Sequence, residues 1–347
     1  SFTIIPCVVL AVLVRVMKSM GAVLSYFTYL ILFYNHSVAL RDVGNLDVTL
    51  RYLVLLLVAS SVVSFSLEPE ERLGIVGESG AGKSVAAFAI LNLISRPGYI
   101  SGGEILFEGQ DLTQLSPQEM RSIRGNRISM IFQDPMMTLN PVLTVGVQMT
   151  EVLHAHREIS AEEARSRALQ TLTRVHISSP EKRFDQYPHE LSGGMRQRVV
   201  IATALLTESS LIIADEPTTA LDVTIQAEIM DLLLELCELN NVGLILITHD
   251  LGVISQVTQR AIVMYAGRVV EAGPIWEIVN NAQHPYTQGL IGALPQQTTP
   301  GKRLNQIRGV MPSLSNIPEG CAFNPRCQLV MEVCRSSVPT YTNIGST

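Results

Sequence analysis

Short apolar runs recur along the chain and are separated by amphipathic stretches. Residues 73–76, 211–214 and 244–247 are such runs, and strands that are apolar on both faces belong to parallel sheets covered by helices. Residues 223–239, between the last two runs, repeat apolar positions at helical spacing and predict an amphipathic helix. The pattern therefore predicts an α/β fold built on a mainly parallel sheet.

Capping sequences mark two helix starts in the middle of the chain. Ser116 precedes Glu119 by three residues, and Ser160 precedes Glu163 by the same interval. In this pattern the serine accepts a hydrogen bond from the first helical turn and the glutamate returns one. The second pattern opens a helix to about Val175, and residues 136–190, between two strand-bearing regions, are therefore expected to be a mainly helical insertion in the α/β core.

Shorter strand patterns flank these elements. Residues 46–50 and 62–67 alternate apolar and polar positions, as strands do, and strands are also expected at 128–132 and twice within 260–275. A simple hairpin between the first two segments is contradicted by the apolar run 53–58, where a polar turn is expected. An antiparallel β subdomain near this end of the chain is thus left open.

Residues 1–38 differ in character from the rest of the chain. Two apolar runs, Ile4–Val14 and Met20–Tyr34, are separated by Arg15 and Lys18, and each run is shorter than the ~20 residues of a membrane-spanning helix. One helix across both runs would bury two cations, at a cost of several kcal/mol. A secretory signal fits poorly because the basic residues follow the first apolar run. A membrane anchor, a packed accessory segment and a non-native start remain open.

Composition and charge exclude some classes of protein. The formal net charge of −6 gives no basis for a nucleic-acid-binding surface. Five cysteines in 347 residues are not the framework of a small secreted disulfide protein. The length is sufficient for one large domain or two smaller ones.

The apolar run 73–76 leads into the segment Gly77–Ser84, which fits the phosphate-binding pattern G-x-x-x-x-G-K-[ST]. An apolar stretch of helical character begins at Val85, so the pattern has the strand–loop–helix context that it needs. Backbone N–H groups of such a loop, together with the helix dipole, hold phosphate oxygens. Lys83 is expected to reach the β- and γ-phosphates, and the Ser84 hydroxyl to bind Mg²⁺. The alternative is a chance glycine-rich turn.

Polar residues follow the other two core strands. Asp215 and Glu216 come directly after one apolar run, and His249 follows the other. Ligands of parallel sheets bind at the carboxyl ends of the strands, so these side chains are expected to converge with Lys83. Asp215 is expected to organise Mg²⁺ and Glu216 to activate an attacking water as general base. A solvated strand end is the alternative interpretation.

Residues 191–198, Leu-Ser-Gly-Gly-Met-Arg-Gln-Arg, form a second anion-binding pattern. Ser192, Gly193 and Gly194 stand at a helix start, where N–H groups, a hydroxyl and the helix dipole meet. Two phosphate sites in one chain are unusual for an ordinary kinase. The chain instead resembles the ABC ATPases, in which the L-S-G-G segment of one subunit closes on the nucleotide held by the phosphate loop of another.

The resemblance runs from about residue 39 to the C-terminal region and implies a P-loop NTPase of the ABC type, with an antiparallel β subdomain and a helical subdomain. Gln133 matches the glutamine that senses Mg²⁺ and water, and His249 matches the histidine that contacts the γ-phosphate. Tyr52 is the candidate for stacking on adenine. The resemblance implies that nucleotide is bound by Gly77, Glu78, Ser79, Gly80, Ala81, Gly82, Lys83, Ser84, Val85, Tyr52, Ser192, Gly193, Gly194 and Asp222. It implies that the catalytic residues are Glu216, His249, Gln133 and Lys83. It also implies that Mg²⁺ is bound by Ser84, Gln133 and Asp215.

Three stretches, residues 132–141, 214–222 and 284–287, resemble the ATP-binding subunits of dipeptide, oligopeptide and nickel importers. This resemblance implies an ATPase that is peripheral on the cytoplasmic face of the plasma membrane and powers uptake of peptides or a related solute. The implied partners are two membrane permeases, a second ABC ATPase subunit and, indirectly, an extracytoplasmic solute-binding protein, with no nucleic acid.

Cys321, Cys327 and Cys334 lie in the C-terminal region and are candidates for a metal or iron–sulfur site. This subfamily commonly carries four cysteines there, and some members are thought to hold a [4Fe–4S] cluster. The fourth cysteine is missing here, so a complete cluster would need an outside ligand, and reduced thiols are the alternative.

The expected organisation is a hydrophobic extension at 1–38, an ABC ATPase domain at 39–275 and a C-terminal extension at 276–347. An ABC ATPase of DNA maintenance is an alternative, but such proteins carry long coiled coils, and no heptads separate Ser84 from Ser192. Translation factors of this superfamily usually carry two cassettes. A non-functional product with aberrant ends is a further alternative.

Overall fold

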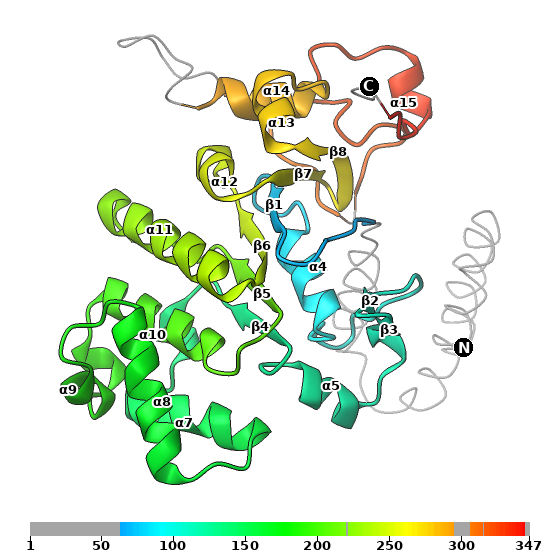
Figure 1. Ribbon diagram of the computed structural model, residues 1–347. Coiled ribbons are helices and arrows are strands. Elements are labelled where there is room, and N and C mark those ends of the chain that lie inside the picture. Colours follow the sequence, from blue (N-terminus) through cyan, green and yellow to red (C-terminus); the bar gives the residue numbers. More distant parts are fainter. Residues whose placement is uncertain (1–62, 220, 295–305, 315, 344–347) are drawn as a thin grey trace, which may run out of the picture. The chain divides into compact units, whose positions relative to one another are not determined.

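The computed structural model describes residues 63–219, 221–294, 306–314 and 316–343. These residues are built around a six-stranded sheet with the strand order β4-β5-β6-β1-β7-β8 (Figure 1). Neighbouring strands from β4 to β7 pair in parallel, and β8 pairs with β7 in the antiparallel sense. The strands are β1 Arg72–Val76, β4 Ile128–Ile131, β5 Leu211–Asp215, β6 Gly243–Thr248, β7 Arg260–Tyr265 and β8 Arg268–Pro274.

Two hydrophobic cores lie on opposite faces of this sheet, because successive side chains of a strand point to opposite sides. In β6, Leu244 and Leu246 belong to the core shared with α10, α11 and α12, whereas Ile245 and Ile247 belong to the core shared with α4 and α5. Every residue of β5 and β6 is buried. This double burial explains why the strands are apolar without alternation.

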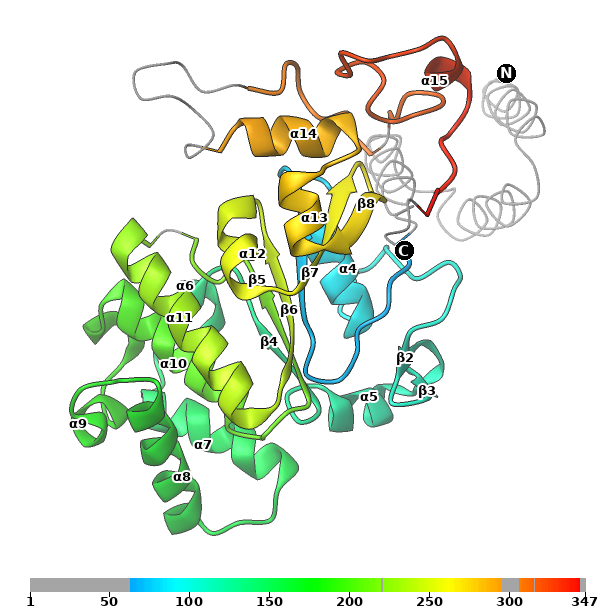
Figure 2. The same ribbon diagram turned by 45° about the horizontal axis from the view of Figure 1, so that its top comes forward.

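The helices cover the sheet and extend beyond both of its edges. Helices α7 and α8 pack on each other and on α10, on the β4 side of the sheet, whereas α13 packs on β8 at the other edge (Figure 2). The helices are α4 Lys83–Ile90, α5 Pro117–Ile123, α6 Pro135–Thr138, α7 Val145–His156, α8 Ala161–Arg174, α9 Pro180–Phe184, α10 Gly193–Leu205, α11 Val223–Asn240, α12 Leu251–Val257, α13 Ile275–Asn280, α14 Pro285–Gly292 and α15 Val333–Ser336, with 3-10 turns at η2 Leu112–Gln114 and η3 Pro188–Glu190.

The predicted helix starts are formed. Ser116 and Glu119 make both hydrogen bonds of a capping box at the start of α5. Ser160 accepts a hydrogen bond from the N–H of Glu163 at the start of α8. The segment between β4 and α10 consists mainly of helices, as its sequence predicts.

The strand expected at 62–67 is not formed in its described part, residues 63–67. Val63, Phe65 and Leu67 are partly buried against the core that includes α4, whereas Ser64 and Ser66 are exposed, so the alternation marks one side of the segment that packs on the core. A strand forms only when a neighbouring segment supplies hydrogen bonds, and the other strand expected in this region, 46–50, lies outside the described residues. A small antiparallel pair is instead formed by β2 Leu106–Phe107 and β3 Gln110–Asp111.

The expectations for residues 1–38, for the run 53–58 and for Tyr52 also fall outside the described residues. Within the described ranges, none of the helices combines the length and the apolar character that a bilayer crossing requires.

Candidate nucleotide-binding site

The loop between β1 and α4 is shaped by glycines at positions where other residues would not fit. Gly80 and Gly82 have φ angles of 85° and 96°, in the left-handed region that favours glycine. A side chain at Gly77 would clash with the main-chain carbonyl of Met264 in β7. The loop therefore curls tightly against the sheet and ends in the first turn of α4, as an anion-binding loop must.

Lys83, the first residue of α4, is folded back across this loop. Its side chain is 5% exposed, and Nζ donates to the carbonyl oxygens of Gly77 at 2.8 Å and Glu78 at 3.1 Å. Burial lowers the pKa of Lys83, and the carboxylate of Glu216, 4.0 Å from Nζ, acts in the opposite direction. The ammonium group thus spans the concave side of the loop, where phosphate oxygens are expected.

Ser84 and Asp215 form a pair of oxygen donors beside Lys83. The Ser84 hydroxyl donates to Oδ1 of Asp215 at 3.0 Å, and Asp215 is only 3% exposed. Burial raises the pKa of Asp215, while the hydrogen bond from Ser84 opposes the shift. Hydroxyl and carboxylate oxygens are the ligands that Mg²⁺ prefers, so this pair fits a Mg²⁺ ion bound with phosphate.

Glu216 lies at the centre of the polar cluster and has a φ of 45°. Its Oε2 accepts from Nε2 of Gln133 at 3.0 Å and from the hydroxyl of Thr219 at 3.0 Å. Its Oε1 lies 3.2 Å from Nδ1 of His249. The segments that follow the carboxyl ends of β1, β4, β5 and β6 thereby bring together Lys83, Gln133, Glu216 and His249. Thr219 was missed by sequence reasoning, although its place three residues after Glu216 on a short turn is a usable signal.

Ser192, Gly193 and Gly194 lie at the start of α10. The Ser192 hydroxyl caps the helix by accepting from the N–H of Met195 at 3.3 Å, and Asp222 caps α11 by accepting from Ile225 at 3.0 Å. No hydrogen bond or ion pair within the described ranges joins Ser192 or Asp222 to Lys83 or Glu216. The second anion-binding segment therefore does not complete the first one within this chain's described residues.

The three C-terminal cysteines lie in one segment, where the N–H of Cys321 donates to the carbonyl of Cys334 at 2.9 Å. Burial raises the pKa of the Cys321 thiol. In the part of the chain that the structure describes, no group of three His, Cys, Asp or Glu side chains is arranged to hold a metal ion. The expected iron–sulfur site therefore gains no support from the geometry of Cys321, Cys327 and Cys334.

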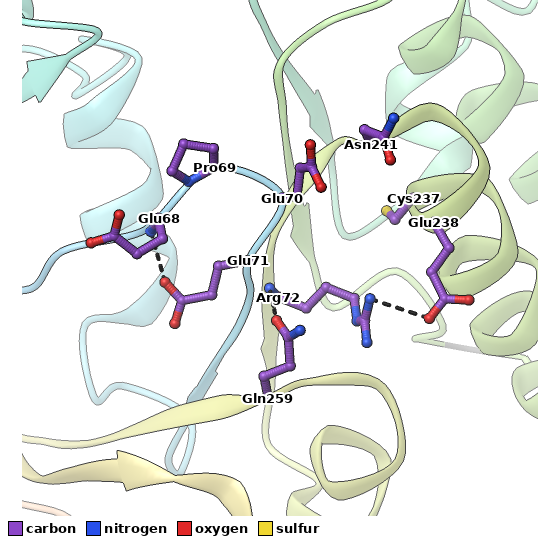
Figure 3. A pocket seen from close by; sticks show the side chains of 9 residues that line it. All are labelled: Glu68, Pro69, Glu70, Glu71, Arg72, Cys237, Glu238, Asn241 and Gln259. Carbon is purple, nitrogen blue, oxygen red and sulfur yellow. Dashed lines mark hydrogen bonds and ion pairs between the residues drawn. The ribbon is translucent and has the colours of Figure 1, made fainter.

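A separate open pocket of about 590 Å³ lies at the opposite, amino-terminal end of β1 (Figure 3). Figure 3 shows Arg72 directed toward Glu238, at 3.2 Å, and the backbone N–H of Arg72 donates to Gln259. Burial raises the pKa of the Cys237 thiol in its wall to about 12, which makes this thiol unreactive. None of the residues predicted for the phosphate site lines this pocket.

Comparisons with known proteins agree with this geometry. The family described as "ABC transporter" matches residues 61–219, and "Oligopeptide/dipeptide transporter, C-terminal region" matches residues 270–334. The oligopeptide transport ATP-binding protein OppD of Bacillus subtilis is 51% identical over 287 residues, which are 82% of this chain and 80% of the relative. A putative peptide import ATP-binding protein of Brucella melitensis is 45% identical over 316 residues, 88% of this chain and 94% of the relative.

Solved structures show the same likeness. A dimeric ATP-binding cassette in a post-hydrolysis state, bound to ADP and Pi, is 31% identical with a TM-score of 0.55 over 61% of this chain and 89% of that one. The cbiO1 protein of Clostridium perfringens, part of the ABC transporter complex cbiONQ, is 29% identical with a TM-score of 0.55 over 64% of this chain and 84% of that one.

Proposed function

The chain belongs to the ABC transporter family of ATP-binding proteins, and from this membership we propose that it powers the import of di- or oligopeptides, or of a related solute such as nickel. It is an ABC ATPase, so ATP and Mg²⁺ are its general cofactors. The observation that carries the proposal is the polar cluster around Glu216, which joins the phosphate loop to Gln133 and His249. The relatives reported above are named for peptide import, which favours the importer over DNA maintenance.

Each member of the cluster is assigned a chemical role. Glu216 accepts the proton of the attacking water, because it is the carboxylate held between Gln133 and His249. Ser84 and Asp215 would hold Mg²⁺, which would supply charge stabilisation at the β- and γ-phosphates. Lys83 and the loop N–H groups hold those phosphates, and the hydrogen bonds from Gln133 and Thr219 keep the Glu216 carboxylate oriented.

A second ABC ATPase subunit is proposed to complete the site. Ser192, Gly193 and Gly194 offer a helix start and a hydroxyl, but no hydrogen bond joins them to Lys83 or Glu216 in the part of the chain that the structure describes. A role in trans, on the nucleotide held by the partner subunit, accounts for the absence of such hydrogen bonds among the described residues. The dimeric state of the similar cassette supports the assignment.

Contact with membrane permeases is assigned to the surface directly after Gln133. Met136, Met137 and Val142 are 47%, 84% and 74% exposed, and we propose that they form one patch, because exposed apolar patches mark interaction sites. A permease docked there would be linked to the site through Gln133, which bonds Glu216. We propose that the chain is a peripheral subunit on the cytoplasmic face of the plasma membrane, and that solutes are recognised by the permeases and an extracytoplasmic binding protein.

The domain bounds and the state of the C-terminal cysteines are also part of the proposal. The ATPase domain is proposed to span residues 39–275 with its helical subdomain at 136–190, between the hydrophobic extension 1–38 and the C-terminal extension 276–347. Cys321, Cys327 and Cys334 are proposed to be reduced thiols, and they are free cysteines in the structure.

The test is affinity purification of the tagged chain from detergent-solubilised membranes, followed by mass spectrometry. Two multi-spanning permeases and a second ABC ATPase are expected to co-purify. Met137→Asp serves as the matched variant: it should lose the permeases while retaining ATP binding, because the Met137 side chain is 84% exposed and no hydrogen bond joins Met137 to the phosphate loop among the described residues. Recovery of the chain with nucleic acid, or with no membrane protein at all, would refute the importer assignment.

A further inference from the structure

Glu78, the second residue of the phosphate loop, forms an ion pair with Arg326 of the C-terminal extension. Two guanidinium nitrogens of Arg326 donate to its two carboxylate oxygens, at 2.6 Å and 3.0 Å. The two residues are 248 positions apart in the chain. The Arg326 side chain is only 4% exposed and that of Glu78 is 33% exposed. This is a bidentate, largely buried ion pair, a strong and directional kind of contact.

Arg326 is itself held in place on several sides. Its Nε donates to the carbonyl of Arg308 at 2.9 Å. The guanidinium also lies 5.8 Å from the ring centre of Tyr265 and 6.0 Å from that of Phe323. A guanidinium fixed by a carbonyl and two aromatic faces cannot turn away from Glu78 at little cost. Arg326 therefore presents a preorganised positive charge to the phosphate loop.

The backbone of the loop is held by the same extension. The N–H of Glu78 donates to the hydroxyl of Tyr286 at 2.8 Å, and Tyr286 is fully buried. The sulfur of Met311 lies 3.9 Å from the position that a β-carbon on Gly80 would occupy. The carboxylate and N–H of Glu78 thus both face the extension, while its carbonyl accepts from Lys83. Glu78 links Arg326 to the lysine that spans the loop.

This arrangement matters because a carboxylate in a loop that holds a triphosphate would repel the ligand. In a partly buried site, water and salt screen such a repulsion weakly. We propose that Arg326 is a positioning residue of the nucleotide site, which neutralises Glu78 and fixes the loop so that the phosphates of ATP can bind. The inference rests on the proposed function and adds that the C-terminal extension controls nucleotide affinity.

The experiment compares the full chain with Arg326→Gln, Arg326→Lys and the double variant Glu78→Gln/Arg326→Gln. Arg335→Gln is the matched control, because Arg335 lies in the same extension, is 59% exposed and pairs only with Glu332 among the described residues. Affinity for Mg-ATP and for uncharged adenosine is measured by titration, and KM and kcat are measured for ATP hydrolysis.

Arg326→Gln is expected to weaken Mg-ATP binding about tenfold and to raise KM more than it lowers kcat. Adenosine binding should not change, because adenosine carries no phosphate. Arg326→Lys should keep part of the affinity, since an ammonium group supplies charge without the bidentate geometry. The double variant should recover most of the loss, because the repelling carboxylate is gone. A purely structural role of Arg326 would not produce this recovery.

Wild-type affinity for Mg-ATP in Arg326→Gln, or no recovery in the double variant, would overturn the proposal. If Arg326→Gln does not fold, the double variant decides: affinity near that of the wild type supports neutralisation, and a tenfold loss overturns it. Failure of the wild-type chain to bind ATP would instead contradict the proposed function, so the two failures are distinguishable.

Discussion

Replacing Glu216 by glutamine tests the chemistry of the site with a minimal change of shape. The glutamine oxygen can take the place of Oε2 and accept from Gln133 and Thr219, as the carboxylate does at 3.0 Å from each. Its amide NH₂ then takes the place of Oε1 and can donate to Nδ1 of His249, 3.2 Å away. The φ of 45° is equally accessible to both side chains. The hydrogen bonds of the cluster should therefore survive, whereas residue 216 loses its basicity and the negative charge that lies 4.0 Å from Nζ of Lys83.

The expected effect is large on turnover and small on binding. A positioned general base contributes about 10²- to 10⁴-fold to rate, which corresponds to about 2.7 to 5.4 kcal/mol in the activation free energy. Stability should change by less than about 1 kcal/mol, because each hydrogen bond has a replacement. Binding of Mg-ATP should be retained, because the loop, Ser84 and Asp215 are untouched.

The assay pairs steady-state ATP hydrolysis with an equilibrium titration of Mg-ATP. Glu163→Gln is the matched control, because Glu163 pairs with Arg167 on the surface of α8, away from the site, and should hydrolyse ATP like the wild type. Turnover of Glu216→Gln equal to that of the wild type would refute the base assignment. Loss of ATP binding together with turnover would show that Glu216 holds the nucleotide instead of activating water.

Two further substitutions address the partner subunit and the buried carboxylate. Ser192→Arg should leave nucleotide binding by the isolated subunit intact but prevent the ATP-dependent dimer, as measured by size-exclusion chromatography. Ser160→Arg is the control, because it removes an equivalent helix cap on α8 and should still dimerise. A normal dimer of Ser192→Arg would contradict the role in trans. Asp215→Asn should abolish Mg²⁺-dependent hydrolysis yet raise the unfolding free energy of the nucleotide-free chain at neutral pH by on the order of 1 kcal/mol. Burial raises the pKa of Asp215 in the folded chain above its ordinary value of 3.8. At a pH between 3.8 and the raised pKa, the folded chain therefore holds a proton that the unfolded chain has lost. The free energy of unfolding consequently falls as the pH rises through this range. Urea denaturation at several pH values should show this decrease in the free energy of unfolding with rising pH in the wild type, and a smaller decrease in Asp215→Asn. If Asp215→Asn is less stable than the wild type at neutral pH, the reasoning is wrong.

The sequence alone was sufficient for the fold class, the family and the type of enzyme. The reason is that these depend on local signals: apolar runs that need burial on both faces, glycines at Gly80 and Gly82 that permit a left-handed turn, and polar residues placed at strand ends. The topology of a parallel sheet then brings strand ends to one edge without further information. Lys83, Asp215 and His249 were therefore expected near one another, and the structure brings them there through contacts of Ser84 and Glu216.

The tertiary structure alone decided three other features. Residues 63–67 alternate like a strand but form no ladder, because hydrogen-bond partners are a property of the assembled sheet. The three C-terminal cysteines are close in sequence, yet no metal-binding group forms from the described residues. The pairing of Arg326 with Glu78 spans 248 positions and follows no repeat or motif. Such a contact exists only because folding packs the C-terminal extension behind the phosphate loop, and long-range packing of this kind leaves no periodic trace along the chain.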